Sequence, residues 1–177
     1  GDGFETIQNA VIGGTNPLDV ININGADIWT ANADITTDAS GSDINLADGL
    51  AGGTLNLNNG LTYTGEIDAD TTDIVNIGGD MAGTTITGIG AIQGAAVNLQ
   101  SGTFIAQAQL GSVAPLASLT IADGTIMDLQ NGATTSGVLD LDGTVYIGST
   151  NSITADTYTG NDGDGASIRV GISQAGA

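Results

Sequence analysis

The chain of 177 residues contains no cysteine, no histidine and no lysine, and its single basic residue is Arg169. The absence of cysteine excludes a disulfide scaffold, cysteine metal sites and thiol catalysis. The absence of histidine removes the commonest general base and the imidazole metal ligand. One arginine cannot neutralise a row of phosphates, so we expect no nucleic-acid partner and no attraction to anionic membrane surfaces.

Aromatic residues and long apolar runs are also scarce. Aromatic side chains make up 3% of the chain, and no apolar run approaches the ~20 residues of a membrane-spanning helix, so we expect no membrane insertion. What is present is 29 glycines, 40% apolar residues and 20 acidic residues, which give a formal charge of −19. Nearly all the acids are aspartates, which favour turns over helices. This composition predicts a turn-rich β protein with a thin aliphatic core.

Two weak internal repeats run along the chain. A Gly-Thr dipeptide begins at positions 53, 83, 102, 124 and 143, with gaps of 30, 19, 22 and 19 residues. An apolar–(Asn or Asp)–apolar triplet recurs at 21–23, 44–46, 55–57, 75–77, 97–99, 127–129 and 139–141.

In both series most gaps lie near 20 residues or near a multiple or a half of 20 residues, which favours a repeating unit of about 20 residues. A unit of that size is one coil of a β-solenoid. In such a coil the two apolar residues of each triplet point inward and the polar residue points outward. The alternative is a series of antiparallel hairpins, because Asn-Gly and Asp-Gly turns recur between the strands.

The N-terminal segment has a different pattern. Phe4, Ile7 and Val11 are spaced as one face of a short helix, and the glycine pair at 13–14 would end it. We therefore expect a short capping helix within residues 1–14 and β-coils over residues 19–172.

Residues 1–11, with the strand that begins at Asp19, resemble the start of right-handed parallel β-helix proteins of the pectin-lyase-like type. In that family an amphipathic helix with a Thr-Ile-Gln-x-Ala pattern caps the first coil. Residues 118–129 and 137–147 resemble, in style, the passenger domains of bacterial autotransporters and filamentous adhesins. The resemblance implies an all-β fold, a right-handed parallel β-helix (β-solenoid) that forms a single domain over residues 1–177.

The same resemblance raises the question of catalysis, because the family includes carbohydrate-active enzymes that combine aspartates with arginine or lysine. Here Arg169 stands alone near the C-terminus, and a charge of −19 would repel anionic uronate substrates. We therefore expect the protein not to be an enzyme.

Acidic residues give the candidate metal sites. Asn161, Asp162 and Asp164 lie among glycines in residues 160–165, and their oxygens suit Ca²⁺. The alternative is a solvated acidic turn. The acids at 68, 70 and 73 and those at 140 and 142 are further candidates for acid–base chemistry or calcium, with the same alternative. We expect no other cofactor.

Three Thr-x-Thr motifs begin at positions 62, 85 and 157 and resemble the ladder of ice-binding solenoids. Their gaps of 23 and 72 residues break the one-per-coil spacing that such a ladder needs. Threonine is also simply a good strand residue.

These observations favour a non-enzymatic extracellular structural protein, a subunit of a self-assembling filament or layer at the cell surface. One alternative is an adhesin or autotransporter passenger fragment that binds a surface ligand, and another is a calcium- or carbohydrate-binding β-helix. The residues after the strand near Arg169 contain no visible cap. Because the acidic sides should repel each other, we expect any homo-oligomer to form through the solenoid ends.

Overall fold

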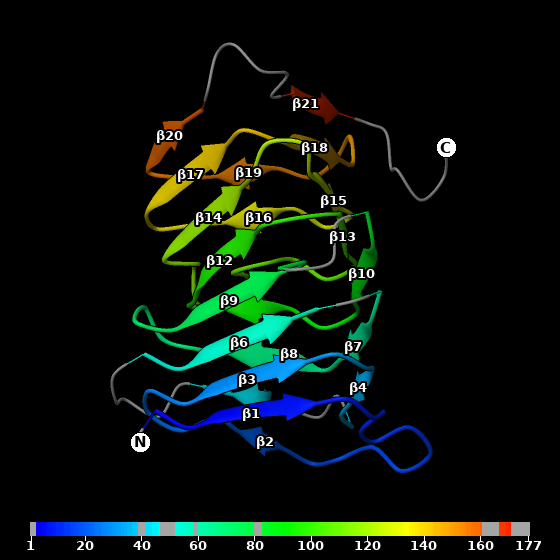
Figure 1. The fold of residues 1–177 in the computed structure, drawn as a ribbon. Helices are drawn as coiled ribbons and strands as arrows, with labels where there is room; N and C mark the ends of the chain where they lie inside the picture. Colours follow the sequence, from blue (N-terminus) through cyan, green and yellow to red (C-terminus); the bar gives the residue numbers. More distant parts are fainter. Residues whose placement is uncertain are drawn as a thin grey trace.

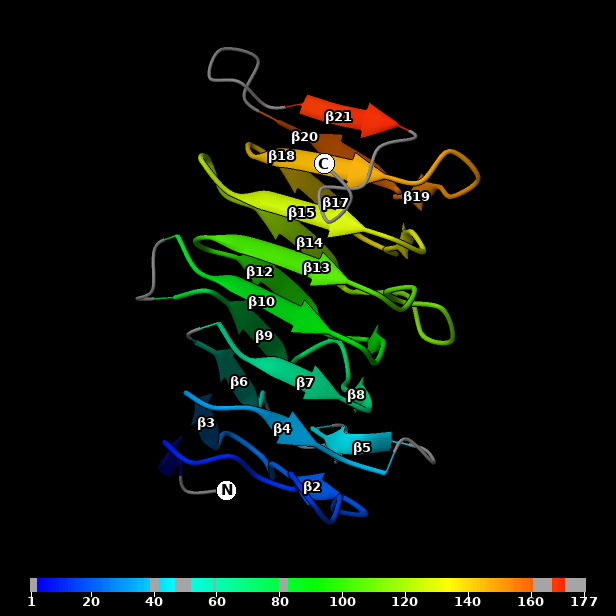
Figure 2. The ribbon, with the colours of Figure 1, turned by 90° about the vertical axis from the view of Figure 1, so that its right-hand side faces the viewer.

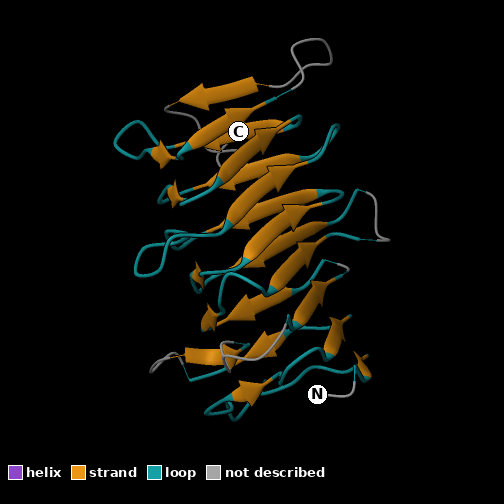
Figure 3. Cartoon of the chain, turned by 90° about the vertical axis from the view of Figure 1, so that its left-hand side faces the viewer, coloured by secondary structure: helices purple, strands orange, loops and turns teal. Residues whose placement is uncertain are grey.

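The computed structural model describes residues 3–38, 42–46, 52–58, 60–79, 83–160 and 167–170. Every helix or strand assigned in these ranges is a β-strand, and Figure 3 shows strands joined by loops. All the strand pairs of the described part are parallel. The prediction of a parallel β-solenoid is therefore confirmed, and the hairpin alternative is wrong.

One face of the solenoid is an eight-stranded sheet. Its strands, in spatial order, are β1 (Glu5–Gln8), β3 (Ile28–Ala31), β6 (Thr54–Leu57), β9 (Ile74–Ile77), β12 (Ala96–Leu99), β14 (Ser118–Ile121), β17 (Val138–Leu141) and β20 (Thr157–Thr159). Paired residues in successive strands lie 23, 26, 20, 22, 22, 20 and 19 positions apart. Each coil therefore has about the length that the sequence repeats predict.

Two further faces complete each coil. The seven-stranded sheet, which faces the viewer in Figure 2, contains β4 (Ile35–Thr36), β7 (Thr62–Thr64), β10 (Thr85–Gly88), β13 (Thr103–Ala106), β15 (Ile126–Leu129), β18 (Thr144–Ile147) and β21 (Ser167–Val170). The third face contains β2 (Ile21–Asn22), β5 (Ser42–Asn45), β8 (Glu66–Asp68) and β11 (Ile92–Gln93), together with the pair β16 (Ala133–Thr134) and β19 (Ile153–Thr154).

The coils wind with a right hand. In Figure 1 the strands of the eight-stranded sheet cross the front from left to right, the chain returns behind them, and each return lies higher than the last. This is the hand that parallel β-crossovers almost always take, because it follows the right-handed twist of the strands.

The polar-centred triplets occupy all three faces. Four lie in β6, β9, β12 and β17 of the eight-stranded sheet, two lie at β2 and β5 of the third face, and one lies in β15 of the seven-stranded sheet. Two successive triplets on different faces are separated by only part of a coil. This explains why the triplets at 44–46 and 55–57 lie 11 residues apart, and those at 127–129 and 139–141 lie 12 residues apart. In β6, β12 and β14 buried residues alternate with half-buried ones, so the apolar flanks form the core as predicted.

The predicted N-terminal capping helix is wrong, because residues 5–8 form strand β1. Each of the four residues of β1 pairs with one residue of β3. A helix of two turns has a costly nucleus, whereas the edge of β3 offers a ready-made ladder of backbone partners. Ile7, placed on the buried stripe of the expected helix, is 56% exposed. The first coil therefore starts at β1, ahead of the first strand that the sequence predicts.

The core is thin, and one position shows how closely it is filled. Tyr63 is fully buried between the faces, and its hydroxyl donates to the Gly90 carbonyl at 3.0 Å. Gly88, its neighbour on β10, leaves the room that the ring occupies, since a Cβ there would lie 2.3 Å from the Tyr63 hydroxyl oxygen. Burial raises the pKa of the Tyr63 hydroxyl far above its usual value.

Candidate functional site

The outer surface of the eight-stranded sheet carries a ladder of asparagine side chains. The Asn98 amide donates to the Asn76 side-chain oxygen at 3.0 Å, and the Asn76 amide donates to the Asn56 side-chain oxygen at 2.9 Å. The Asn56 amide in turn donates to the Thr30 hydroxyl at 3.1 Å. The outward polar stack expected from the triplets is therefore confirmed, and its hydrogen bonds run in one direction from coil to coil.

Several aspartates join neighbouring coils. Asp73 is buried, and its two carboxylate oxygens accept the backbone N–H of Gly53 at 2.7 Å and that of Asp70 at 2.8 Å. Asp27 accepts the N–H of Phe4 in the coil below at 3.1 Å. These carboxylates satisfy backbone donors at the corners where the chain leaves one sheet for the next.

Two acids of the cluster at 68, 70 and 73 accept hydrogen bonds within the same turn. Asp70 also accepts from both the backbone N–H and the hydroxyl of Thr72, so Asp70 and Asp73 act as turn acceptors. Within the described ranges, no group of three His, Cys, Asp or Glu residues could hold a metal ion.

The strongest calcium candidate of the sequence lies outside the described residues. Asn161, Asp162 and Asp164 all fall between Gly160, where the long described range ends, and β21. Calcium binding at these three residues stays a prediction.

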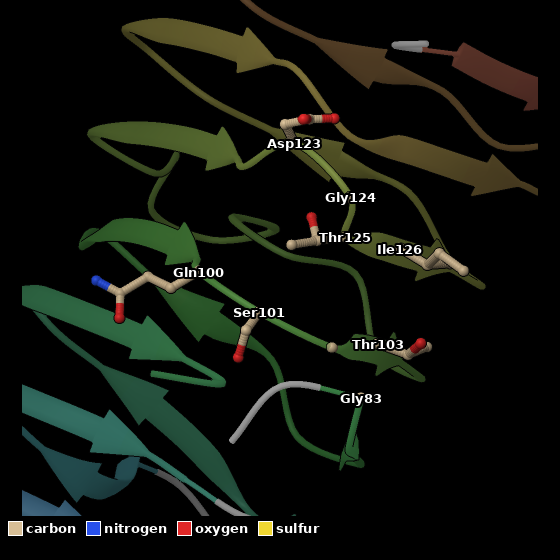
Figure 4. A pocket seen from close by; sticks show the side chains of 9 residues that line it. Gly83, Gln100, Ser101, Thr103, Asp123, Gly124, Thr125 and Ile126 are labelled. Carbon is tan, nitrogen blue, oxygen red and sulfur yellow. The ribbon is translucent and has the colours of Figure 1, made fainter. Parts of the chain in front are cut away.

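A shallow groove of about 380 Å³ is lined by the turns that lead into β13 and β15 and by Gly83, which precedes β10. Figure 4 shows its lining, which includes Ser101, Thr125 and Asp123. The Ser101 hydroxyl donates to the Gly78 carbonyl and the Thr125 hydroxyl to the Ala122 carbonyl, both at 2.6 Å. Asp123 is the only acid among the described lining residues. The described lining of the groove therefore contains one carboxylate, whereas glycoside hydrolysis uses a pair.

A loop motif that sequence analysis missed occurs twice, at residues 12–18 and 110–116. Each copy reads Ile/Leu-Gly-x-x-x-Pro-Leu, and the two copies contain both prolines of the chain. Gly13 and Gly111 adopt positive φ angles of 71° and 65°. The apolar residues that open and close each loop bridge to the next coil, in the pairs Ile12–Ile35, Leu18–Thr37, Leu110–Ala133 and Leu116–Thr135. The placement of the only two prolines is the signal that could have found the motif.

The buried side chain of Gln93 holds the second copy of this loop by hydrogen bonds. The Gln93 side-chain oxygen accepts the backbone N–H groups of Val113 and Ala114, both at 3.1 Å, and its amide donates to the Ser112 hydroxyl at 3.0 Å. Val113 is nevertheless 83% exposed. The loop thus holds an apolar side chain outward on a fixed backbone.

The Thr-x-Thr motifs do not form one ladder. Those in β7 and β10 lie on adjacent strands of the seven-stranded sheet, offset so that Thr87 pairs with Thr62. The third motif, Thr157–Thr159, lies in β20 of the eight-stranded sheet. The ice-binding alternative requires one such motif per coil on a single face, which this arrangement does not provide.

The two ends of the solenoid differ from its sides. Seven of the eleven large apolar side chains that are exposed in the described residues belong to the first or last coil: Phe4, Ile7, Val11, Leu18, Val20, Tyr158 and Ile168. Within the described residues, β1 ends the eight-stranded sheet on one side and β20 ends it on the other, so each has a strand partner on one side only. In the described part, the buried polar side-chain atoms without a hydrogen-bond partner are Gln8 Oε1 and Trp29 Nε1, which both lie in the first two coils.

None of the described elements is a helix of the length and apolar character needed to cross a bilayer. Comparison of the chain with protein-family models, with curated proteins and with solved structures finds no match. The features of the molecule that bear on function are therefore the coil stack, its ladders, the loop held by Gln93 and the two ends.

Proposed function

We propose that the protein is a non-enzymatic structural subunit that assembles into a filament or layer at the cell surface. The observation that carries this proposal is the pair of open strand edges, each flanked by exposed apolar side chains. An unpaired edge with exposed apolar residues is a template for another strand. The sides of the solenoid offer fewer such sites, because only four of the eleven exposed large apolar side chains of the described residues lie there and the chain carries a charge of −19.

Negative-stain electron microscopy and sedimentation of the pure protein over a range of concentrations test this function. We expect elongated oligomers whose length grows with concentration. Added salt screens repulsion between the acidic sides, so bundles of such oligomers should appear only at high ionic strength. Single particles at every concentration and salt would contradict the proposal.

The fastened loop at residues 110–116 favours a second candidate, an adhesin that binds a surface ligand. Its support is the exposure of Val113 on a backbone that Gln93 holds in place. Binding of the labelled protein to an array of immobilised glycans and matrix proteins tests it. Val113→Ser should lower any genuine signal, and Val138→Ser, which removes a less exposed side chain of the same kind, serves as the matched control.

Calcium binding by Asn161, Asp162 and Asp164 is a separate proposal, supported by the oxygen-rich sequence alone. We expect millimolar Ca²⁺ to raise the Tm of the wild type, and the double variant Asp162→Asn, Asp164→Asn to lose that rise. An unchanged Tm of the wild type would contradict the proposal.

A further inference from the structure

Building on the proposed assembly, we propose that its partner is a second copy of this chain, stacked head to tail. In this contact, β20 of one copy pairs in parallel with β1 of the next, in the register that the coils already use. The inference rests on the proposed function, and it specifies which strands and residues meet.

Strand direction makes the two ends complementary to each other. All eight strands of the large sheet are parallel, so β20 runs in the same direction as β1 and can take the place of a preceding strand. Paired positions in this sheet form continuous columns from β1 to β20. Continuing these columns places Thr157, Tyr158 and Thr159 of one copy opposite Glu5, Thr6 and Ile7 of the next.

The second large sheet continues in the same way. Val170 of β21 pairs with Ile147, and at the opposite end of the same column Ile12 bridges to Ile35. One stacking operation therefore brings Val170 of one copy opposite Ile12 of the next, without a change of register. Each internal coil likewise pairs with its neighbours in both large sheets at once.

Exposed apolar side chains at both ends favour association. Tyr158 is 59% exposed, although Leu119 and Leu139 of its column are buried, and Ile7, in the half-buried outer column, is 56% exposed. Removing such side chains from water is the main driving force for association. Copies that met side by side would leave both groups exposed.

Charge favours the same orientation. Arg169, the only cationic residue of the chain, lies in β21 at one end. The first two coils at the other end contain Glu5, Asp27 and Asp34. In the continued register Arg169 lies opposite Val11, one strand from Asp34. Stacking of two first coils on each other would instead bring their acidic residues together.

Disulfide trapping tests the register, because the natural chain has no cysteine. Ile7→Cys and Thr159→Cys are made as separate variants, mixed in equal amounts and oxidised. Residues paired in adjacent strands of the stack lie ~4.8 Å apart, within the Cα separation that a disulfide accepts. The control mixture pairs Ile7→Cys with Thr120→Cys, since Thr120 occupies the same outward column in the interior of the stack.

We expect the first mixture to give a heterodimer on a non-reducing gel at least tenfold more abundant than in the control mixture. Equal yields in the two mixtures, with oligomers still seen by microscopy, would overturn the register while the proposed function stands. Absence of oligomers and of the heterodimer would overturn both. Circular dichroism and melting of each variant establish folding, and Thr159→Asp with Ile7→Asp gives a second test, because facing carboxylates should abolish assembly at low salt.

Discussion

The middle and the ends of the solenoid contain the same kind of strand in different surroundings. In β14, at the centre, buried residues alternate with half-buried ones. In β1 three of four residues are exposed, and in β20 all three are exposed. Yet each residue of β1 pairs with β3 as regularly as β14 pairs with its neighbour β12. The difference is the number of neighbouring coils, so burial here is a property of the stack rather than of the strand.

Stability should therefore fall from the middle to the ends. Each internal coil is held by two interfaces, whereas the first and last coils are held by one within the chain. Matched substitutions at the centre and at an end measure this gradient.

Truncation of a core aromatic should give the largest difference. Phe104 is fully buried in β13 and Tyr158 is mostly exposed in β20. We expect Phe104→Ala to lower the free energy of unfolding by about 3–5 kcal/mol, and Tyr158→Ala to change it by about 0.5 kcal/mol or less at concentrations where the protein is monomeric. Urea unfolding followed by circular dichroism gives both values. Similar losses would show that the end coil is packed as tightly as the centre.

The corner carboxylates give the next comparison. Asp73→Asn leaves one buried N–H without its charged acceptor, and we expect a loss of about 1–3 kcal/mol. Asp27 accepts the Phe4 N–H with one oxygen at the exposed first coil, so Asp27→Asn keeps an acceptor for it, loses only the charge of that acceptor, and should cost less than about 1 kcal/mol. The same unfolding measurement decides between them, and a larger loss for Asp27→Asn would contradict the gradient.

Tyr63 should make the middle of the solenoid sensitive to alkaline pH. The raised pKa means that the folded state keeps the phenol protonated while the unfolded state ionises near pH 10. Its contribution to stability is therefore complete below about pH 10 and declines above it. Tyr63→Phe should cost about 1 kcal/mol at pH 7 through the lost bond to Gly90, and should flatten the decline between pH 9 and 11. Urea unfolding of the wild type and of Tyr63→Phe at each pH measures both effects, and an equally steep decline in the variant would contradict this role of Tyr63.

The asparagine ladder should give the smallest effect. Asn76 both donates to Asn56 and accepts from Asn98, so Asn76→Ala breaks two rungs, and we expect a loss of about 0.5–1.5 kcal/mol. The Asn45 side-chain amide donates to the Asn22 side-chain oxygen at 3.3 Å near the first coils. We expect Asn45→Ala to lower the free energy of unfolding by a few tenths of a kcal/mol. Hydrogen exchange of the β9 and β5 amides would show whether the local opening follows the same order.

Much of this architecture is predictable from the sequence because the solenoid repeats its interactions. Side chains alternate along a strand, so the triplet centred on Asn76 predicts that Val75 and Ile77 point into the core and that the Asn76 side chain points outward. The coil length follows from the spacing of such triplets on one face. These inferences need only a local sequence pattern that is repeated from coil to coil.

The errors arise where the neighbours of a segment decide its conformation. Phe4, Ile7 and Val11 fit a helical stripe, yet the free edge of β3 draws this segment into the sheet. The role of Asp73 was not predictable, because its two partners come from a turn and from the coil below. Gln93 gave no signal for the same reason: the loop that it fastens lies about 20 residues farther along the chain.

The two ends of the solenoid should complete each other in the register of the coils. Electron microscopy of the assembled protein measures this most directly as the axial rise per subunit. Eight strands in the long sheet, at ~4.8 Å for each coil, predict a rise of about 38 Å, with the strand spacing continuing unbroken across the junction. A rise well above this value, or a two-fold axis between adjacent subunits, would contradict head-to-tail stacking in register.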